Sequence, residues 1–213
     1  MAIPGYSAEA ISSTPCEAVA RVGECVCRAA AEHAVAVVRC ASTQDTEGGC
    51  VGFNIAVVIS AEGRIVGAQH KMQLVPTYDG WCKPGMRLRL FELKGALFAI
   101  IVCHDKRDTE LARLPVLAGA RVLFYLSAET WHDDLPLPAP RQPPWSEEML
   151  AAEVGVYRAQ AKARAVENRV WLVKSNVAGC IDAPDSGSHG GSCVIDPTGI
   201  VVVESGMCEA GHQ

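Results

Sequence analysis

The chain has 213 residues, of which 49% are hydrophobic and 20% charged, and its formal net charge is −5. This length and composition fit one globular domain with a sizeable core, which we assign to residues 1–213 as a whole. No cluster of Lys and Arg marks a nucleic-acid partner, and no apolar run is long enough to predict a membrane span. The N-terminal residues lack the pattern of a secretory signal peptide.

Apolar periodicity and turn residues predict strands and helices along the whole chain. In the first half they are a helix up to about residue 32, a buried strand over 35–38, a polar loop over 40–52, a hairpin of strands over 53–60 and 64–69, and a loop through 84–85. The helix start is predicted from Thr14 as N-cap, Pro15 at the first helical position and Glu17 at the third.

In the second half the predicted elements are a strand over 97–102, a helix over 108–118, a strand over 121–126, an extended proline-rich loop over 133–145, a helix from Ser146 to about residue 168, a strand over 170–175, a flexible turn over 187–191, and a closing hairpin over 192–196 and 200–204. The strand over 97–102 is a near-continuous apolar run, which is typical of burial on both faces, and the strand over 121–126 is also expected to be buried. The alternation predicts an α/β domain with mixed sheets, layered helix–sheet–sheet–helix.

The sequence contains 10 cysteines, several of them within apolar runs. This distribution indicates free thiols in a reducing compartment rather than a disulfide framework, and so predicts a cytoplasmic protein. Cys25 and Cys27, with His33, invite comparison with a zinc site. Their spacing differs from the usual Cys-x-x-Cys pair and no second ligand pair follows, so we expect no metal.

Cys103 and Lys71 are the candidates for chemistry. Cys103 ends the predicted strand over 97–102, and ligands bind at the carboxyl ends of strands in α/β sheets. Backbone N–H groups at a following helix start also favour a thiolate. Taken alone, however, a cysteine in this position is more often a core residue, and Lys71 is more often a solvated surface charge.

Four segments together resemble the nitrilase superfamily of carbon–nitrogen hydrolases, in the family's order and over about residues 53–204. FNIAVVISAEGRIVGAQHKMQL resembles the hairpin that delivers the catalytic lysine, here Lys71. FAIIVCHDKRDTELARLPVLAGARVLFY resembles the nucleophile block around Cys103. The other two, AKARAVENRVWLVKSNVAG and SHGGSCVIDPTGIVV, resemble a structural helix with its following strand and a closing hairpin.

The resemblance implies a four-layer α-β-β-α sandwich and covalent catalysis without a metal or organic cofactor. The Cys103 thiolate would attack the carbon of an amide, a carbamoyl group or a nitrile, and water would hydrolyse the resulting thioester. The Lys71 ammonium and the backbone N–H of His104 would stabilise the developing charge. Asp79 lies in the loop after the lysine, where the family often has a second acidic residue, and is a candidate for substrate binding.

The family's third catalytic residue is a glutamate that acts as general base a few residues before a Gly-Tyr pair. Gly5-Tyr6 resembles that pair, so the glutamate and the first strand and helix of the fold would lie at or before residue 1. We therefore expect a chain that is incomplete at both ends and hydrolyses amides poorly. The nucleophile block also departs from the family, with Lys106 and Asp108 where apolar residues are common and Thr109 where proline is usual.

The leading hypothesis is an amidase or carbamoylase that releases ammonia from a small molecule, with nitrile hydrolysis less favoured, in a homo-oligomer. The alternative is a non-catalytic family member that acts as a subunit or scaffold. The missing glutamate favours the alternative, whereas the presence of Lys71 and Cys103 argues against it. A Cys-His hydrolase would need a histidine near Cys103, and His104, next along a strand, would point to the opposite face.

Overall fold

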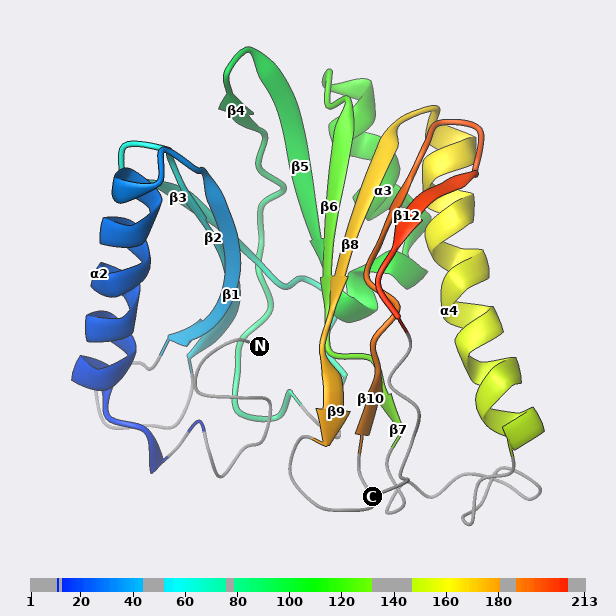
Figure 1. Ribbon diagram of the computed structural model, residues 1–213, viewed down its shortest axis with the longest axis horizontal. Helices are drawn as coiled ribbons and strands as arrows, with labels where there is room; N and C mark the ends of the chain where they lie inside the picture. Colours follow the sequence, from blue (N-terminus) through cyan, green and yellow to red (C-terminus); the bar gives the residue numbers. More distant parts are fainter. Residues whose placement is uncertain are drawn as a thin grey trace.

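A computed structural model of the chain describes residue 11 and residues 13–43, 52–75, 79–131, 147–180 and 187–206. Helix α2 (Cys16–Glu32) covers the outer face of a small sheet, and helices α3 (Thr109–Leu117) and α4 (Glu147–Asn168) cover the outer face of a larger sheet (Figure 1). The two sheets pack against each other between these helices. The predicted α-β-β-α sandwich with mixed sheets is therefore confirmed.

The small sheet is antiparallel and consists of β1 (Val37–Thr43), β2 (Phe53–Ile59) and β3 (Ile65–His70), in that order. Because side chains alternate along a strand, Ile55 and Val57 of β2 pack toward α2, whereas Ala56 packs toward the larger sheet. The predicted hairpin over 53–60 and 64–69 is confirmed, since β2 and β3 pair in antiparallel register.

Strand β1 is longer than the sequence predicts. A strand over 35–38 and a polar loop over 40–52 are expected, whereas the strand continues to Thr43. Its polar end pairs with β2, and Ser42 lies opposite Asn54. The prediction was wrong here because a neighbouring strand satisfies the backbone groups of these residues, whatever the polarity of their side chains.

The larger sheet is mixed and has the strand order β12-β11-β8-β6-β5-β4. Its strands are β4 (Phe91–Leu93), β5 (Ala96–Val102), β6 (Val122–Ser127), β8 (Trp171–Asn176), β11 (Cys193–Ile195) and β12 (Val201–Glu204). β5, β6 and β8 run parallel in the centre, and the outer strands pair antiparallel. The predicted strands of this sheet and its closing hairpin are therefore present, and the apolar end of β5 is buried throughout.

Four short strands have no counterpart among the predicted elements. β4 pairs with β5 across Lys94-Gly95, where both residues have a positive φ (50° and 77°), as in a tight hairpin turn. β10 (Gly187–His189) lies in the segment predicted as a flexible turn, and that prediction was wrong. It pairs with two other short strands, the distant β7 (Thr130–Trp131) and the preceding β9 (Ala178–Cys180).

The helices agree with the sequence except at one end. α2 begins at Cys16, so Pro15 is its N-cap, one residue later than the predicted Thr14, and no side chain caps it. The start of α4 predicted at Ser146 and the proline-rich loop over 133–145 lie outside the described residues. Within the part of the chain that the structure describes, no helix is long and apolar enough to cross a membrane.

The core between the sheets brings the carboxyl end of β5 against the small sheet. Ala56 and Val58 of β2 pack on Phe98, Ile100 and Val102 of β5. Full burial of an aliphatic or aromatic side chain contributes about 1.5–3 kcal/mol. This packing therefore holds the end of β5 close to the small sheet, from which the segment after β3 emerges.

Candidate active site

Cys103 lies where β5 gives way to a short 3₁₀ helix, η1 (Cys103–Arg107). Its φ is +51°, in the left-handed region that residues with a side chain seldom adopt. Such a conformation persists only where the surroundings enforce it, and it often marks a functional site. The side chain is half-buried and packs at the edge of the core between the sheets.

The carboxylate of Asp105 holds this turn in place. Its Oδ2 accepts the backbone N–H of Val102 (3.0 Å), and its Oδ1 accepts those of Met72 (3.1 Å) and Gln73 (2.7 Å). Asp105 thereby joins the nucleophile turn to the segment that follows Lys71. Burial raises the pKa of Asp105 to about 6, although the three backbone hydrogen bonds favour its charged form.

Asp105 should make the stability of the protein depend on pH. Since its folded pKa of about 6 lies above the ordinary value of 3.8, its contribution is complete below pH 3.8 and is lost as the pH rises through about 6. The loss corresponds to about 3 kcal/mol. We expect this loss in a comparison of the wild type with Asp105→Asn by urea unfolding. The difference between their free energies of unfolding should decrease by about 3 kcal/mol from pH 4 to pH 7. A constant difference would contradict the assignment.

Lys71 follows β3 and is fully buried. Its Nζ lies 2.5 Å from Asp79 Oδ2, which also accepts the backbone N–H of Val75 (2.7 Å). Burial acts to lower the pKa of Lys71, but the charges of Cys103 and Asp79 outweigh it, so the pKa is raised. Lys71 therefore remains an ammonium group, and its charge interacts with the Cys103 side chain.

The backbone around Lys71 is fixed as firmly as its side chain. Its N–H donates to the carbonyl of Asn54 (2.8 Å), and its carbonyl accepts the N–H of Gly85 (2.7 Å). A Cβ atom at Gly85 would lie 2.7 Å from the Cβ of His70, so only glycine permits this approach. The lysine is thus held between β2 and the segment before β4.

Several ionisable side chains in this region are neutral. Burial raises the pKa of Cys40 and of Cys82 to about 11, so these thiols remain protonated at neutral pH. Burial, followed by the charges of Arg107 and Lys71, lowers the pKa of His104 to about 4. The imidazole is therefore neutral, and the role of the His104 N–H as a donor to the oxyanion stays a prediction.

The structure places Lys71, Asp79, Cys103 and His104 in one region, and adds to them two acidic residues that the sequence analysis did not assign to the site. Asp105 bridges the two segments, and Glu129 neutralises the buried Lys106. The sequence signal for Glu129 was Lys106, which stands where the family commonly has an apolar residue and therefore needs a buried counter-charge. Within the described ranges, no group of three or more His, Cys, Asp or Glu side chains is arranged to hold a metal.

Comparison with known proteins identifies the family. Residues 1–211 match the family of carbon–nitrogen hydrolases. The chain belongs to this family. Family membership is in keeping with a cysteine mechanism, and it confirms the resemblance to the nitrilase superfamily.

Among curated members of the carbon–nitrogen hydrolase family, the 2-oxoglutaramate amidase of Bacillus subtilis (strain 168) is 31% identical over 159 residues, which are 74% of this chain and 53% of that protein. A hydrolase in the agr operon of Staphylococcus lugdunensis is 29% identical over 161 residues, 74% of this chain and 59% of that protein. The chain thus spans about half the length of the curated relatives that it matches.

A solved structure of the amidase from Nesterenkonia AN1, a member of the nitrilase superfamily, shares the fold with a TM-score of 0.77. The two chains are 21% identical, and the alignment covers 97% of this chain and 71% of that one. At this level of identity the likeness concerns the fold alone, and it agrees with the four layers described above.

Proposed function

We propose that the protein hydrolyses a non-peptide carbon–nitrogen bond of an amide or N-carbamoyl compound through a thioester on Cys103, with nitriles a less favoured substrate class. The observation that carries this proposal is the buried Lys71 ammonium, paired with Asp79 at 2.5 Å and placed within electrostatic reach of the Cys103 thiolate. The cysteine itself lies at a strand end with a left-handed backbone, a position typical of nucleophiles.

In the proposed reaction, Cys103 Sγ forms a bond to the carbonyl carbon, and negative charge develops on the carbonyl oxygen. The Lys71 ammonium and the His104 N–H stabilise this charge. The C–N bond then breaks, and the nitrogen leaves as ammonia or an amine with the proton that the thiol gave up. Water attacks the thioester, releases the acid and restores the thiol. No metal or organic cofactor takes part.

Two roles are open to Asp79 in this scheme: it orients the Lys71 ammonium, or it contacts the substrate. Its contacts in the structure favour the first. Its carboxylate is buried and engaged with Lys71 Nζ and with the N–H of Val75. We therefore propose first that Asp79 orients the Lys71 ammonium, and contact with the substrate, which the sequence predicts, remains a second proposal.

The second candidate function is that of a non-catalytic subunit. The observation that favours it concerns the acids next to Lys71. Among the described residues, those that most affect the pKa of Lys71 are Asp79 and Asp105, and neither is the glutamate that the family uses as general base. A protein of this kind would keep a reactive thiol and would release no ammonia from any amide, carbamoyl compound or nitrile.

We also propose that the protein is a cytoplasmic homo-oligomer that takes a small-molecule substrate. Free thiols throughout the described residues support a reducing compartment. Apolar side chains exposed on the outer helices support self-association. On α3 these are Leu114 (52% exposed) and Leu117 (66%), and on α4 they are Val156 (48%) and Val166 (46%).

Cys103 should be the most reactive thiol of the protein. Limiting iodoacetamide at pH 7.5, followed by peptide mapping, should label Cys103 ahead of the exposed Cys16 and Cys25. The physical reason is the Lys71 ammonium, whose charge interacts with Cys103, since a nearby cation favours the thiolate form of a cysteine. Preferential labelling of Cys25, Cys27 or Cys82 would contradict the assignment of the nucleophile.

A further inference from the structure

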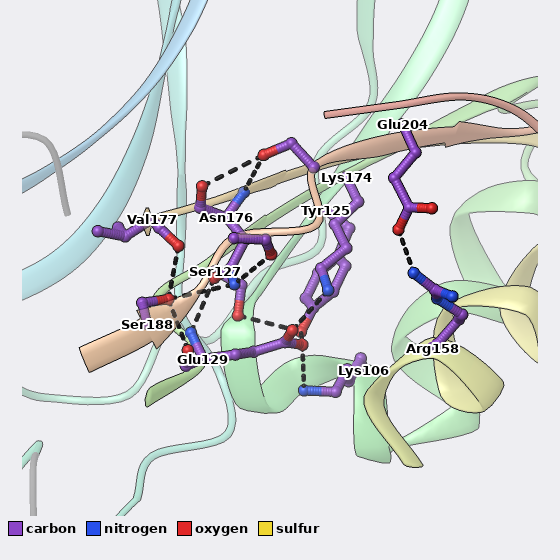
Figure 2. A network of polar contacts seen from close by, with 12 residues as sticks. Lys106, Tyr125, Ser127, Glu129, Arg158, Lys174, Asn176, Val177, Ser188 and Glu204 are labelled. Atoms are coloured by element: carbon purple, nitrogen blue, oxygen red, sulfur yellow. Dashed lines mark hydrogen bonds and ion pairs between the residues drawn. The ribbon is translucent and has the colours of Figure 1, made fainter. Parts of the chain in front are cut away.

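A buried network of charged residues lies behind the nucleophile turn, on the face of the larger sheet that α4 covers (Figure 2). Glu129, which follows β6, is 3% exposed. Its two carboxylate oxygens lie 2.9 Å from Lys106 Nζ and 2.6 Å from Lys174 Nζ, and Tyr125 donates its hydroxyl to the first of them. The network thus holds two cations and one anion in the protein interior, which is a net charge of about +1.

Stability alone does not explain this network. Transfer of a charge from water into a protein interior costs several kcal/mol, and a buried ion pair is often no more stable than apolar residues of similar volume. Lys106 also stands where apolar residues are common in the family. A buried charge cluster beside a reactive group is more often found at a functional site.

Lys106 belongs to the same 3₁₀ turn as Cys103, and both of its ends are fixed. Its carbonyl accepts a hydrogen bond from Arg164 Nε (2.9 Å). Its Nζ lies 4.3 Å from the ring centroid of Tyr157 in α4 and 5.2 Å from that of Tyr125. Because η1 has only 5 residues, a fixed Lys106 restricts the backbone of Cys103.

We infer that Lys106, held by Glu129, is a positioning residue for Cys103: it anchors the turn that carries the nucleophile and places a positive charge on the α4 side of the thiol. Lys71 supplies the charge from the side of the small sheet. The inference rests on the proposed role of Cys103 as nucleophile, and it deepens that role by adding a residue that does not touch the substrate.

The electrostatics around Cys103 support this placement. Burial lowers the pKa of Lys106, while the charges of Glu129 and Cys103 act to raise it, so the side chains of Lys106 and Cys103 interact electrostatically. Among the described residues, Cys40 of β1, Lys71 after β3, Lys106 of η1 and Tyr125 of β6 interact electrostatically with Cys103. The other ionisable groups of this region are His104, Asp105 and Arg107 of η1, Asp79 beside Lys71, and Glu129 beside Lys106. Burial keeps Cys40 and Tyr125 neutral, and Lys71 is shared with Asp79.

Two isoelectric variants separate positioning from general loss of charge. Lys106→Met and Lys174→Met each remove one cation and leave a single Lys–Glu129 pair, so their networks carry the same charge. Only Lys106 is part of the nucleophile turn, since Lys174 reaches the carboxylate from β8. The readout is the rate at which Cys103 reacts with iodoacetamide from pH 5 to pH 10, followed by peptide mapping in the full chain.

For Lys106→Met we expect the midpoint of the alkylation profile to rise by about one pH unit, and the rate at pH 7 to fall about 10-fold, because a thiolate loses a nearby cation. A lower plateau at high pH would report a displaced turn. Lys174→Met should change the rate at pH 7 by less than about 3-fold. Lys106→Arg keeps the charge and should restore the wild-type midpoint, and far-UV circular dichroism should show that all three variants fold.

The outcomes distinguish this inference from the proposed function. If Cys103 is the preferred thiol and Lys106→Met leaves its profile unchanged, or if Lys106→Met and Lys174→Met change it equally, the inference is wrong and the proposed nucleophile stands. If Cys103 is not preferred in the wild type, the proposed function fails and the inference fails with it. If Lys106→Met does not fold, the test is Lys106→Arg. The midpoint of its alkylation profile must then match that of the wild type, and a different midpoint contradicts the inference.

Discussion

Replacement of Cys103 by alanine should abolish the release of ammonia from amides and carbamoyl compounds. The sulfur forms the covalent bond to the substrate, and no neighbouring group can replace it: burial keeps Cys40 and Cys82 protonated, with a pKa of about 11. Loss of a nucleophile or of its essential partner lowers turnover by about 10⁴- to 10⁶-fold in hydrolases that work through covalent intermediates. Whatever the rate of the unmodified protein, the variant should therefore fall to the background.

The measurement is a coupled ammonia assay on a panel of small primary amides, carbamoyl compounds and nitriles, with mass spectrometry of the protein to detect an acyl adduct on Cys103. Cys25→Ser is the matched control, because Cys25 is an exposed thiol on α2 whose sulfur accepts only a local hydrogen bond from Arg28 (3.1 Å). It should keep both the adduct and the activity. Ammonia release that survives in Cys103→Ala would disprove the proposed mechanism.

Replacement of Glu129 by glutamine should destabilise the fold more than any other single change discussed above. Glutamine has nearly the same shape, but it leaves Lys106 and Lys174 buried without a counter-charge. Removal of one partner from a buried ionic network costs about 3–5 kcal/mol. Urea unfolding at pH 7, followed by circular dichroism, should show the loss as a lower midpoint with an unchanged slope.

The control for this experiment removes the whole network at once. In the triple variant Lys106→Met, Glu129→Leu and Lys174→Met, no charge is left without a partner, and apolar groups fill a similar volume. Such replacements are often neutral or stabilising, so this variant should regain most of the stability that Glu129→Gln loses. If Glu129→Gln unfolds within about 0.5 kcal/mol of the wild type, the network is not the tightly coupled unit that its distances describe.

Several parts of this protein could be predicted from the sequence because they depend on neighbouring residues. The apolar run of β5 and the alternating hairpin of β2 and β3 were predicted at nearly their observed bounds. The order of four segments identified the family, and it pointed to Cys103 and Lys71 as the candidate catalytic pair. Local spacing determines which face a side chain occupies, and the ends of apolar runs show where strands stop.

Other parts were decided only by the tertiary structure, because they depend on partners that a local sequence pattern does not identify. The end of β1, and β4 and β10, are strands because other strands offer them hydrogen bonds, not because of their own composition. Asp105 accepts a hydrogen bond from the backbone of Met72, 33 positions away, and Glu129 forms ion pairs with one lysine of η1 and one of β8. A charged residue in a sequence is by default a solvated one. Only the packing of the larger sheet against the small sheet and α4 removes water from these side chains, and so gives them a fixed partner and a part in the site.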